Sequence, residues 1–93
     1  MSSPPERHQP TVVVYTTPWC GYCGRVKDLL HRKGVDFEEI DISRDAALAD
    51  EVARRSGRMT VPQVFVDDQP RGGHDDLVAL ERSGELDAIL GLD

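Results

Sequence analysis

The stretch TVVVYTTPWCGYC, residues 11–23, decides the fold and contains both cysteines of the 93-residue chain. Its first part, residues 11–15, is β-branched and aromatic, which predicts a central strand of a mixed or parallel sheet. After it, apolar residues at helical spacing predict a helix over residues 20–33. Cys20 therefore falls at the N-terminus of a helix, and Cys23 lies one turn in. Two thiols in this position indicate a reversible dithiol.

The two cysteines are expected to differ in reactivity. The first turn of a helix presents unpaired N–H groups and the positive end of the helix dipole, which favour a thiolate at Cys20 over a thiol. Cys23 is turned back along the helix and should be the shielded partner. Because the dipole supplies at most about 2 kcal/mol, N–H bonds to the sulfur or nearby cations must supply the rest. The candidate cations are Arg25 and Arg58.

Other roles for the pair have less support. A structural disulfide between cysteines this close would enclose a very small loop, and nothing in the chain suggests export. A zinc site within one chain would need four ligands, and the histidines, His8, His31 and His74, lie at no usual metal-binding spacing. The main alternative to a redox role is therefore ligation shared between two chains.

Composition limits the classes of protein to which the chain belongs. At 93 residues it is expected to form one domain over residues 11–93, preceded by a disordered, proline-containing leader over residues 1–10. The formal charge of −6 and the pI near 4.9 argue against nucleic acid or an anionic membrane as a partner. The leader has no apolar stretch typical of a signal peptide, so we expect a cytoplasmic protein.

The rest of the chain alternates between strand and helix patterns. Residues 35–42 alternate as a strand, and Ser43 is the expected N-cap of a second helix that Gly57 ends. Pro70 confines the last strand to a sheet edge. The other expected elements are strands at residues 63–66 and 69–71, a helix from 75 to 84, and a helical turn at 86–90. The order β-α-β-α-β-β-α specifies an α/β sheet with helices on both faces.

Three motifs occur at a characteristic spacing: YTTPWCGYC at residues 15–23, RSGRMTVPQ at 55–63 and GGHDDL at 72–77. Together they resemble the glutaredoxins of the thioredoxin-fold superfamily, and the resemblance covers nearly the whole chain. It implies a thioredoxin-like α/β fold with a four-stranded mixed sheet. It also implies a glutathione-dependent thiol–disulfide oxidoreductase that reduces protein disulfides and glutathione mixed disulfides. In such an enzyme Cys20 is the nucleophile and Cys23 the resolving thiol.

The same resemblance implies a glutathione site. Pro62 should be a cis proline, and Val61 should offer its backbone to the cysteinyl part of glutathione. Asp76 should bind the γ-glutamyl ammonium, while the backbone N–H groups of His74 and Asp75 bind the carboxylate. The full set of expected contacts is Tyr22, Thr60, Val61, Pro62, Gly73, His74, Asp75 and Asp76, with Thr17, Arg58 and Gln63 as further candidates. On structural grounds alone, these segments predict a strand entry and a capped glycine turn.

The sequence departs from the pattern of the family at several positions, of which two bear on the predicted function. Thr17 stands where many glutaredoxins carry a lysine that holds the glycyl carboxylate of glutathione, so Arg58 or Gln63 would have to replace it. Gly21 stands where dithiol glutaredoxins usually have proline. Relatives with glycine there include proteins that hold a [2Fe-2S] cluster between two subunits, with glutathione as co-ligand. In such a dimer Cys20 would be the protein's cluster ligand.

Three hypotheses follow. The first, which we favour, is a glutathione-dependent enzyme that is monomeric and holds no metal. The second is a carrier of a glutathione-ligated [2Fe-2S] cluster, dimeric only with the cluster. The third is an enzyme with another electron route, either a thioredoxin-like hydrogen donor for one reductase or a mycothiol-dependent enzyme, since the WCGYC string also resembles the mycoredoxins. The expected partners are a low-molecular-weight thiol and disulfide-bonded or glutathionylated proteins.

Overall fold

Strand β1 (Val12–Thr16) lies inside the sheet, as its run of valines predicts. This computed structural model describes residues 10–92, so the predicted leader lies, except for Pro10, outside the described residues. The strand order is β2-β1-β3-β4, with β2 (Glu38–Asp41), β3 (Gln63–Val66) and β4 (Gln69–Gly72). β2 is parallel to β1, whereas β3 is antiparallel to both β1 and β4. The predicted mixed sheet is therefore confirmed.

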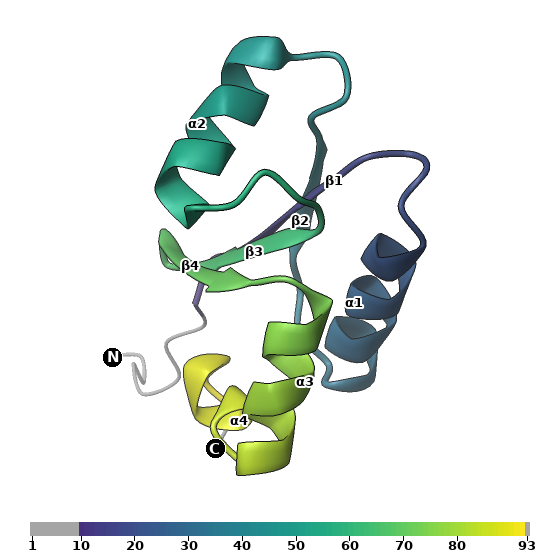
Figure 1. Ribbon diagram of the computed structural model, residues 1–93. Helices are drawn as coiled ribbons and strands as arrows, with labels where there is room; N and C mark the ends of the chain where they lie inside the picture. The colour runs from purple at the N-terminus through teal and green to yellow at the C-terminus, as the bar shows by residue number, and fades with distance from the viewer. Residues whose placement is uncertain (1–9, 93) are drawn as a thin grey trace, which may run out of the picture.

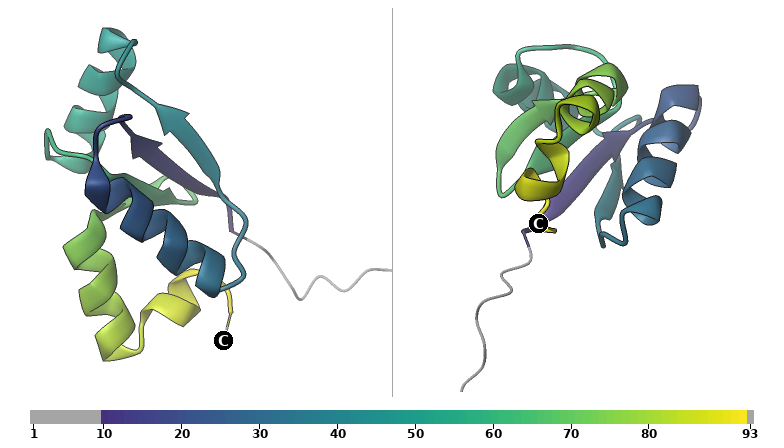
Figure 2. Two further views of the ribbon diagram at one scale, coloured as in Figure 1. Left: turned by 90° about the vertical axis from the view of Figure 1, so that its right-hand side faces the viewer. Right: turned by 90° about the horizontal axis from the view of Figure 1, so that it is seen from below.

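Helices cover both faces of the sheet (Figures 1 and 2). Helices α1 (Gly21–Arg32) and α3 (His74–Ser83) lie side by side on one face, with the short α4 (Leu86–Ile89) beside α3. Helix α2 (Ala46–Ser56) lies on the other face. Among the helices of the described residues, none has the length and apolar character needed to cross a membrane.

The two faces of the sheet bury different sets of side chains, because side chains alternate along a strand. The face under α1 and α3 holds the larger core, made of Val12, Val14, Val26, Leu29, Leu30, Val35, Val64, Val66, Leu77, Leu86 and Leu90. The face under α2 holds a smaller cluster of Tyr15, Val52 and Phe65, in which the Tyr15 and Phe65 rings meet edge to face at 5.4 Å. The helix that carries the dithiol is therefore fixed to the larger core.

The start of α2 differs from the prediction. Ser43 was expected to be its N-cap, and this is wrong: the N-cap is Asp45, whose carboxylate accepts the Leu48 N–H at 3.0 Å. The Ser43 N–H instead donates to the Asp41 carboxylate at 2.8 Å in the preceding turn. Serine and aspartate cap helices about equally well, so local preference did not decide between them. The helix ends at Gly57, in the left-handed conformation, as predicted.

The strand pairing brings the three sequence motifs to one end of the sheet. Because β1 and β3 are antiparallel, the end of β1 adjoins the start of β3, and Tyr15 pairs with Gln63. Because β3 and β4 are also antiparallel, the end of β4 at Gly72 pairs with Val64. Three segments therefore meet at the N-termini of α1 and α3: the dithiol after β1, the proline loop before β3 and the glycine turn after β4.

Candidate active site

Cys20 is the N-cap of α1, and its sulfur has a hydrogen-bond partner in either protonation state. The Cys23 N–H donates to the Cys20 sulfur at 3.2 Å, which suits a thiolate. A thiol proton on the same sulfur can instead be donated to the Val61 carbonyl at 3.5 Å. Cys20 is partly exposed, and the preceding Trp19 is 82% exposed. The first thiol is therefore accessible and is placed as the sequence predicts.

Cys23 has the opposite environment. It is only 3% exposed, and both cysteines are free thiols in this structure. Burial raises the pKa of the Cys23 thiol to about 12, and a hydrogen bond with Cys20 and the charge of Cys20 act in the same direction. Cys23 therefore stays protonated at neutral pH while Cys20 carries the reactive sulfur. The predicted division into an exposed and a shielded thiol is confirmed.

The two cations proposed to support the thiolate contact other groups. Arg25 lies over the Tyr22 ring, with its guanidinium carbon 5.1 Å from the ring centroid. Arg58 binds both carboxylate oxygens of Asp76, at 2.5 and 3.2 Å. The groups placed directly at the Cys20 sulfur are the helix N-terminus and its Cys23 N–H bond, and support of the thiolate by the two arginines stays a prediction.

A cavity of about 200 Å³ opens next to the Val61 carbonyl and contains residues from all three motifs. The Val61-Pro62 peptide bond is cis, as expected. The cavity is lined by Tyr22, Arg58, Thr60, Val61, Pro62, Gly73, His74, Asp75 and Asp76. Every member of the main set of expected binding residues therefore lines one cavity, and Arg58 joins them.

The two glycines of the GGHDDL motif allow the chain to pass close to the cis proline. Gly72 has a φ of 92°, and a Cβ at this position would lie 2.3 Å from Asp76 Oδ2. A Cβ on Gly73 would lie 2.9 Å from the Pro62 carbonyl oxygen. Capping the helix does not by itself require two glycines, but this close approach does. It places the N-terminus of α3 at the edge of the cavity.

Asp76 supplies a negative charge at this helix N-terminus. The hydrogen bonds from Arg58 hold the pKa of its carboxyl below the ordinary value, and the Gly73 N–H, which donates at 2.9 Å, acts in the same direction. A carboxylate therefore lies next to helix N–H groups that attract anions. A ligand that carries an ammonium and a carboxylate on the same carbon fits this pair of charges.

The His74 side chain makes contacts that were not predicted. The resemblance gives a role only to the backbone N–H group of His74. Instead, its ring lies 5.2 Å from the Tyr22 ring, and its Nδ1 lies 3.2 Å from the Asp75 carboxylate. The ring pair joins α1 to α3 beside the cavity. No local pattern could reveal this contact, because its two members lie far apart in the sequence.

Two of the further candidates lie outside the lining of this cavity. The backbone carbonyl of Thr17 accepts the Cys20 N–H at 3.4 Å, so Thr17 helps to shape the turn before α1. Gln63 is 1% exposed, and its Nε2 donates to Thr60 Oγ1 at 3.4 Å. Its Oε1 is buried without a hydrogen-bond partner in the described chain. Of the three further candidates, only Arg58 faces the cavity.

Within the described residues, a metal site in one chain lacks a donor set. Over residues 10–92, no group of three or more His, Cys, Asp or Glu side chains is arranged to hold a metal ion. Of the two thiols, only Cys20 is accessible to an external metal. Any metal bound at Cys20 would therefore need ligands from beyond the described residues.

Comparisons with known proteins agree on one family. The Glutaredoxin family model matches residues 12–70. A protein of Pseudomonas aeruginosa named Glutaredoxin is 56% identical, over 87% of this chain and 96% of its own length. Glutaredoxin 3 of Escherichia coli K12 is 52% identical, over 85% and 95%. The crystal structure of a buckwheat glutaredoxin-glutathione complex superposes with a TM-score of 0.81 at 31% identity, over 87% of this chain and 76% of that chain.

Proposed function

Because this chain belongs to the glutaredoxin family, whose members are thiol–disulfide oxidoreductases, we propose that it reduces protein disulfides and glutathione mixed disulfides with glutathione as electron donor. The observation that carries this proposal is one accessible thiol, Cys20, beside a cavity that presents both signs of charge. The crystal structure of the buckwheat relative in complex with glutathione supports the same co-substrate. We further propose that the enzyme acts as a monomer in the cytoplasm, where thiols stay reduced.

The reaction begins when the Cys20 thiolate attacks one sulfur of a substrate disulfide. A new S–S bond forms to Cys20, the substrate S–S bond breaks, and the other substrate sulfur leaves as a thiolate that takes up a proton. With a glutathionylated protein, the attacked sulfur is that of glutathione. The protein then leaves as a free thiol, and glutathione remains attached to Cys20 above the cavity.

Two routes regenerate the thiolate. In the first, a second glutathione thiolate attacks the bound glutathione sulfur, glutathione disulfide forms, and Cys20 leaves as the thiolate that the Cys23 N–H stabilises. In the second, Cys23 loses its proton and attacks the Cys20 sulfur, which releases the bound thiol and leaves a Cys20–Cys23 disulfide. Two glutathione molecules then reduce this disulfide and become one glutathione disulfide.

The state of Cys20 controls when Cys23 can act. In the reduced enzyme the hydrogen bond with Cys20 and its charge both raise the pKa of Cys23, in addition to burial. Once Cys20 is part of a mixed disulfide, its charge is gone, so this part of the effect is removed. Cys23 consequently ionises more readily at the step that needs its thiolate.

The cavity accommodates the two ends of glutathione by charge. We place the γ-glutamyl ammonium at Asp76, its carboxylate at the first N–H groups of α3, and the cysteinyl backbone at Val61. Arg58 forms an ion pair with Asp76 in this structure. We propose that Arg58 turns to the glycyl carboxylate when glutathione binds, which leaves Asp76 free for the ammonium and compensates for the uncharged Thr17.

The test is the reduction of a glutathionylated peptide, coupled to glutathione reductase. Cys20→Ser should reduce the rate to background, whereas Cys23→Ser should keep much of it, because a second glutathione resolves the mixed disulfide without the inner thiol. Comparable loss in both variants would reject the first route. A parallel assay with mycothiol and its own disulfide reductase separates the electron donors, and faster turnover with mycothiol would favour the mycothiol-dependent hypothesis.

A second candidate function is the [2Fe-2S] carrier, and the observation that favours it is the open space at Gly21. No other part of the described chain comes within 4 Å of the place where a Cβ would stand at this position. Two chains that each supply Cys20 leave two of four thiolate positions for glutathione. Reconstitution with iron and sulfide should then give a coloured dimer only when glutathione is present, and Gly21→Pro should lower its yield. A wild type that stays colourless and monomeric would eliminate this candidate.

A further inference from the structure

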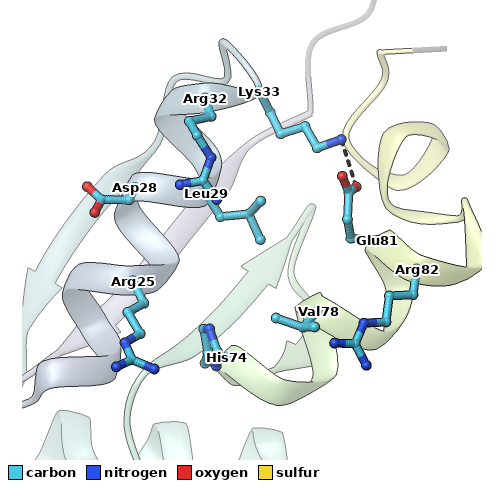
Figure 3. Close-up of a pocket in the computed structure, with 9 residues that line it drawn as sticks. All are labelled: Arg25, Asp28, Leu29, Arg32, Lys33, His74, Val78, Glu81 and Arg82. Atoms are coloured by element: carbon cyan, nitrogen blue, oxygen red, sulfur yellow. Dashed lines mark ion pairs between the residues drawn. The ribbon is translucent and has the colours of Figure 1, made fainter.

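A second hollow, of about 530 Å³, lies between α1 and α3 on the face of the sheet that carries the dithiol (Figure 3). At one end it reaches His74, whose ring centroid lies 5.2 Å from that of Tyr22 with the two rings tilted by 38°. At the other end the Lys33–Glu81 ion pair, at 2.7 Å, connects the two helices. His74 also lines the active-site cavity, so the two hollows adjoin each other.

The walls of this hollow are cationic, although the whole chain carries a formal charge of −6. Arg25 and Arg32 line it from α1 and Arg82 lines it from α3, and within the described chain none of the three forms an ion pair. Lys33 is neutralised by two carboxylates, each at 2.7 Å. The Asp28 carboxylate points away from the space between the helices (Figure 3). We call this feature, which is lined by Arg25, Arg32 and Arg82, the arginine groove.

The floor of the arginine groove is apolar. Leu29 and Val78 point toward each other across it from α1 and α3 (Figure 3). Along α1, the distance from Tyr22 to Lys33 is ~16 Å at the helical rise per residue. An extended polypeptide advances ~3.3 Å per residue, so about five residues would span this length. Arginines around an apolar floor suit a short segment in which carboxylate and apolar side chains alternate.

We propose that the arginine groove binds an acidic segment located within about five residues of the reacting cysteine in protein substrates. This inference rests on the proposed function, since it needs a substrate cysteine bonded to Cys20. A local cationic groove on an acidic protein attracts segments of negative charge and repels those of positive charge. The groove therefore selects among protein disulfides that would otherwise react equally with the exposed thiol.

The experiment uses three peptides that share one internal disulfide and differ in a five-residue tail next to one cysteine. The tails alternate leucine with aspartate, glutamine or lysine. In a single turnover the Cys20 and Cys23 thiols of the reduced protein become a disulfide, and the peptide disulfide is reduced to two thiols. At low salt the acidic tail should react about tenfold faster than the basic tail, with the neutral tail between them, and high salt should reduce the difference.

The matched variants are Arg32→Glu/Arg82→Glu in the groove and Arg44→Glu/Arg54→Glu on the α2 side, which change the net charge equally. All four arginines are exposed, so neither change removes a buried contact. The groove variant should reverse the preference between acidic and basic tails, while the α2-side variant should keep it. Arg32→Gln/Arg82→Gln, which abolishes the charges without reversing them, should make the two tails react within about twofold of each other.

Several results would overturn the inference while leaving the proposed function intact. The first is equal rates for the three tails in the wild type, and the second is equal effects of the two double variants. The third is loss of the preference when inorganic phosphate is added at fixed ionic strength. The fourth is a wild-type dimer that the groove variant dissociates. The last two would assign the groove to small anions or to a second copy of this chain. If instead the neutral-tail peptide were not reduced at all, the proposed function itself would fail.

Discussion

Cys23 must lose a proton before it can resolve a mixed disulfide, and its surroundings oppose that loss. Burial is the largest cause of its raised pKa, and we expect Cys23 to stay buried when Cys20 is bonded to a substrate. The thiolate fraction, and with it the rate of resolution, should therefore rise about tenfold per pH unit from neutral pH upward. The measurement is the release of a peptide from a preformed mixed disulfide with Cys20, by acid quenching in the absence of glutathione.

The control for this pH profile is Cys23→Ser in the same mixed disulfide. It should release no peptide until glutathione is added, because no internal thiolate is available. A wild-type rate that levels off just above pH 9 would mean that the pKa of Cys23 falls to the ordinary thiol value of 9.0 in the mixed disulfide. The burial of this thiol would then not limit turnover.

Asp76 and Asp75 are neighbouring acids with different predicted roles. The Asp76 carboxylate faces the cavity and binds Arg58, while the Asp75 side chain is 98% exposed. Asp76→Asn keeps the shape of the side chain but removes a charge-assisted contact of about 1.5 to 3 kcal/mol with the glutathione ammonium. The KM for glutathione should rise roughly 10- to 150-fold, with little change in the alkylation rate of Cys20.

Asp75→Asn is the matched control, since it removes the same charge one residue earlier. It should change the KM for glutathione by less than about threefold, because an exposed charge contributes little. An equal rise in both variants would mean that glutathione responds to the charge of the helix start as a whole. An unchanged KM in both would reduce Asp76 to a helix cap.

At the scale of the helices, the glycines at the two ends of the site have different structural roles. Gly72 has a left-handed φ, and a Cβ there would clash with Asp76, whereas Gly24 lies inside α1 with open space around it. Gly72→Ala should destabilise the fold by about 1–3 kcal/mol and weaken glutathione binding by displacing Asp76. Gly24→Ala should stabilise the fold by about 0.5–1 kcal/mol through helix propensity.

Urea unfolding of the two variants, followed by circular dichroism, measures both changes. The opposite signs are the essential result, because both substitutions add one methyl group to the chain. If Gly72→Ala unfolded at the wild-type urea concentration, the turn before α3 could shift without strain. The case for two required glycines would then be lost.

At the scale of the whole molecule, α4 closes the larger core. Leu86 is fully buried in that core, while Leu92, a few residues later, is 38% exposed. Leu86→Ala should cost about 2–5 kcal/mol, which lowers the Tm of a domain of this size by at least ~8 °C. Leu92→Ala should stay within about 0.5 kcal/mol of the wild type. Equal melting of the two variants would show that α4 adds little to the core.

Much of this architecture could be predicted because its causes are local. Three elements follow from local features: β1 from its valine run, α1 from the helical spacing after Cys20, and the end of α2 from the glycine that follows it. The order of the elements then limits the topology. The residues of the active-site cavity came from the resemblance to a family, since residues 22, 60 and 76 share no local pattern. The Tyr22–His74 ring pair could not be predicted, because it depends on a distance between helices.

Because one sulfur is buried and the other is accessible, the number of thiols that react with a labelling reagent differs between the folded and the unfolded chain. A thiol reagent too bulky to enter the core would label one sulfur per folded, reduced chain and two after unfolding, because Cys23 is covered and Cys20 is not. The labelled fraction therefore reports the redox state of the dithiol, and the second equivalent reports the folded population. A fluorophore attached at Cys20 would also stand next to Trp19, the only tryptophan, which can serve as its built-in energy-transfer donor.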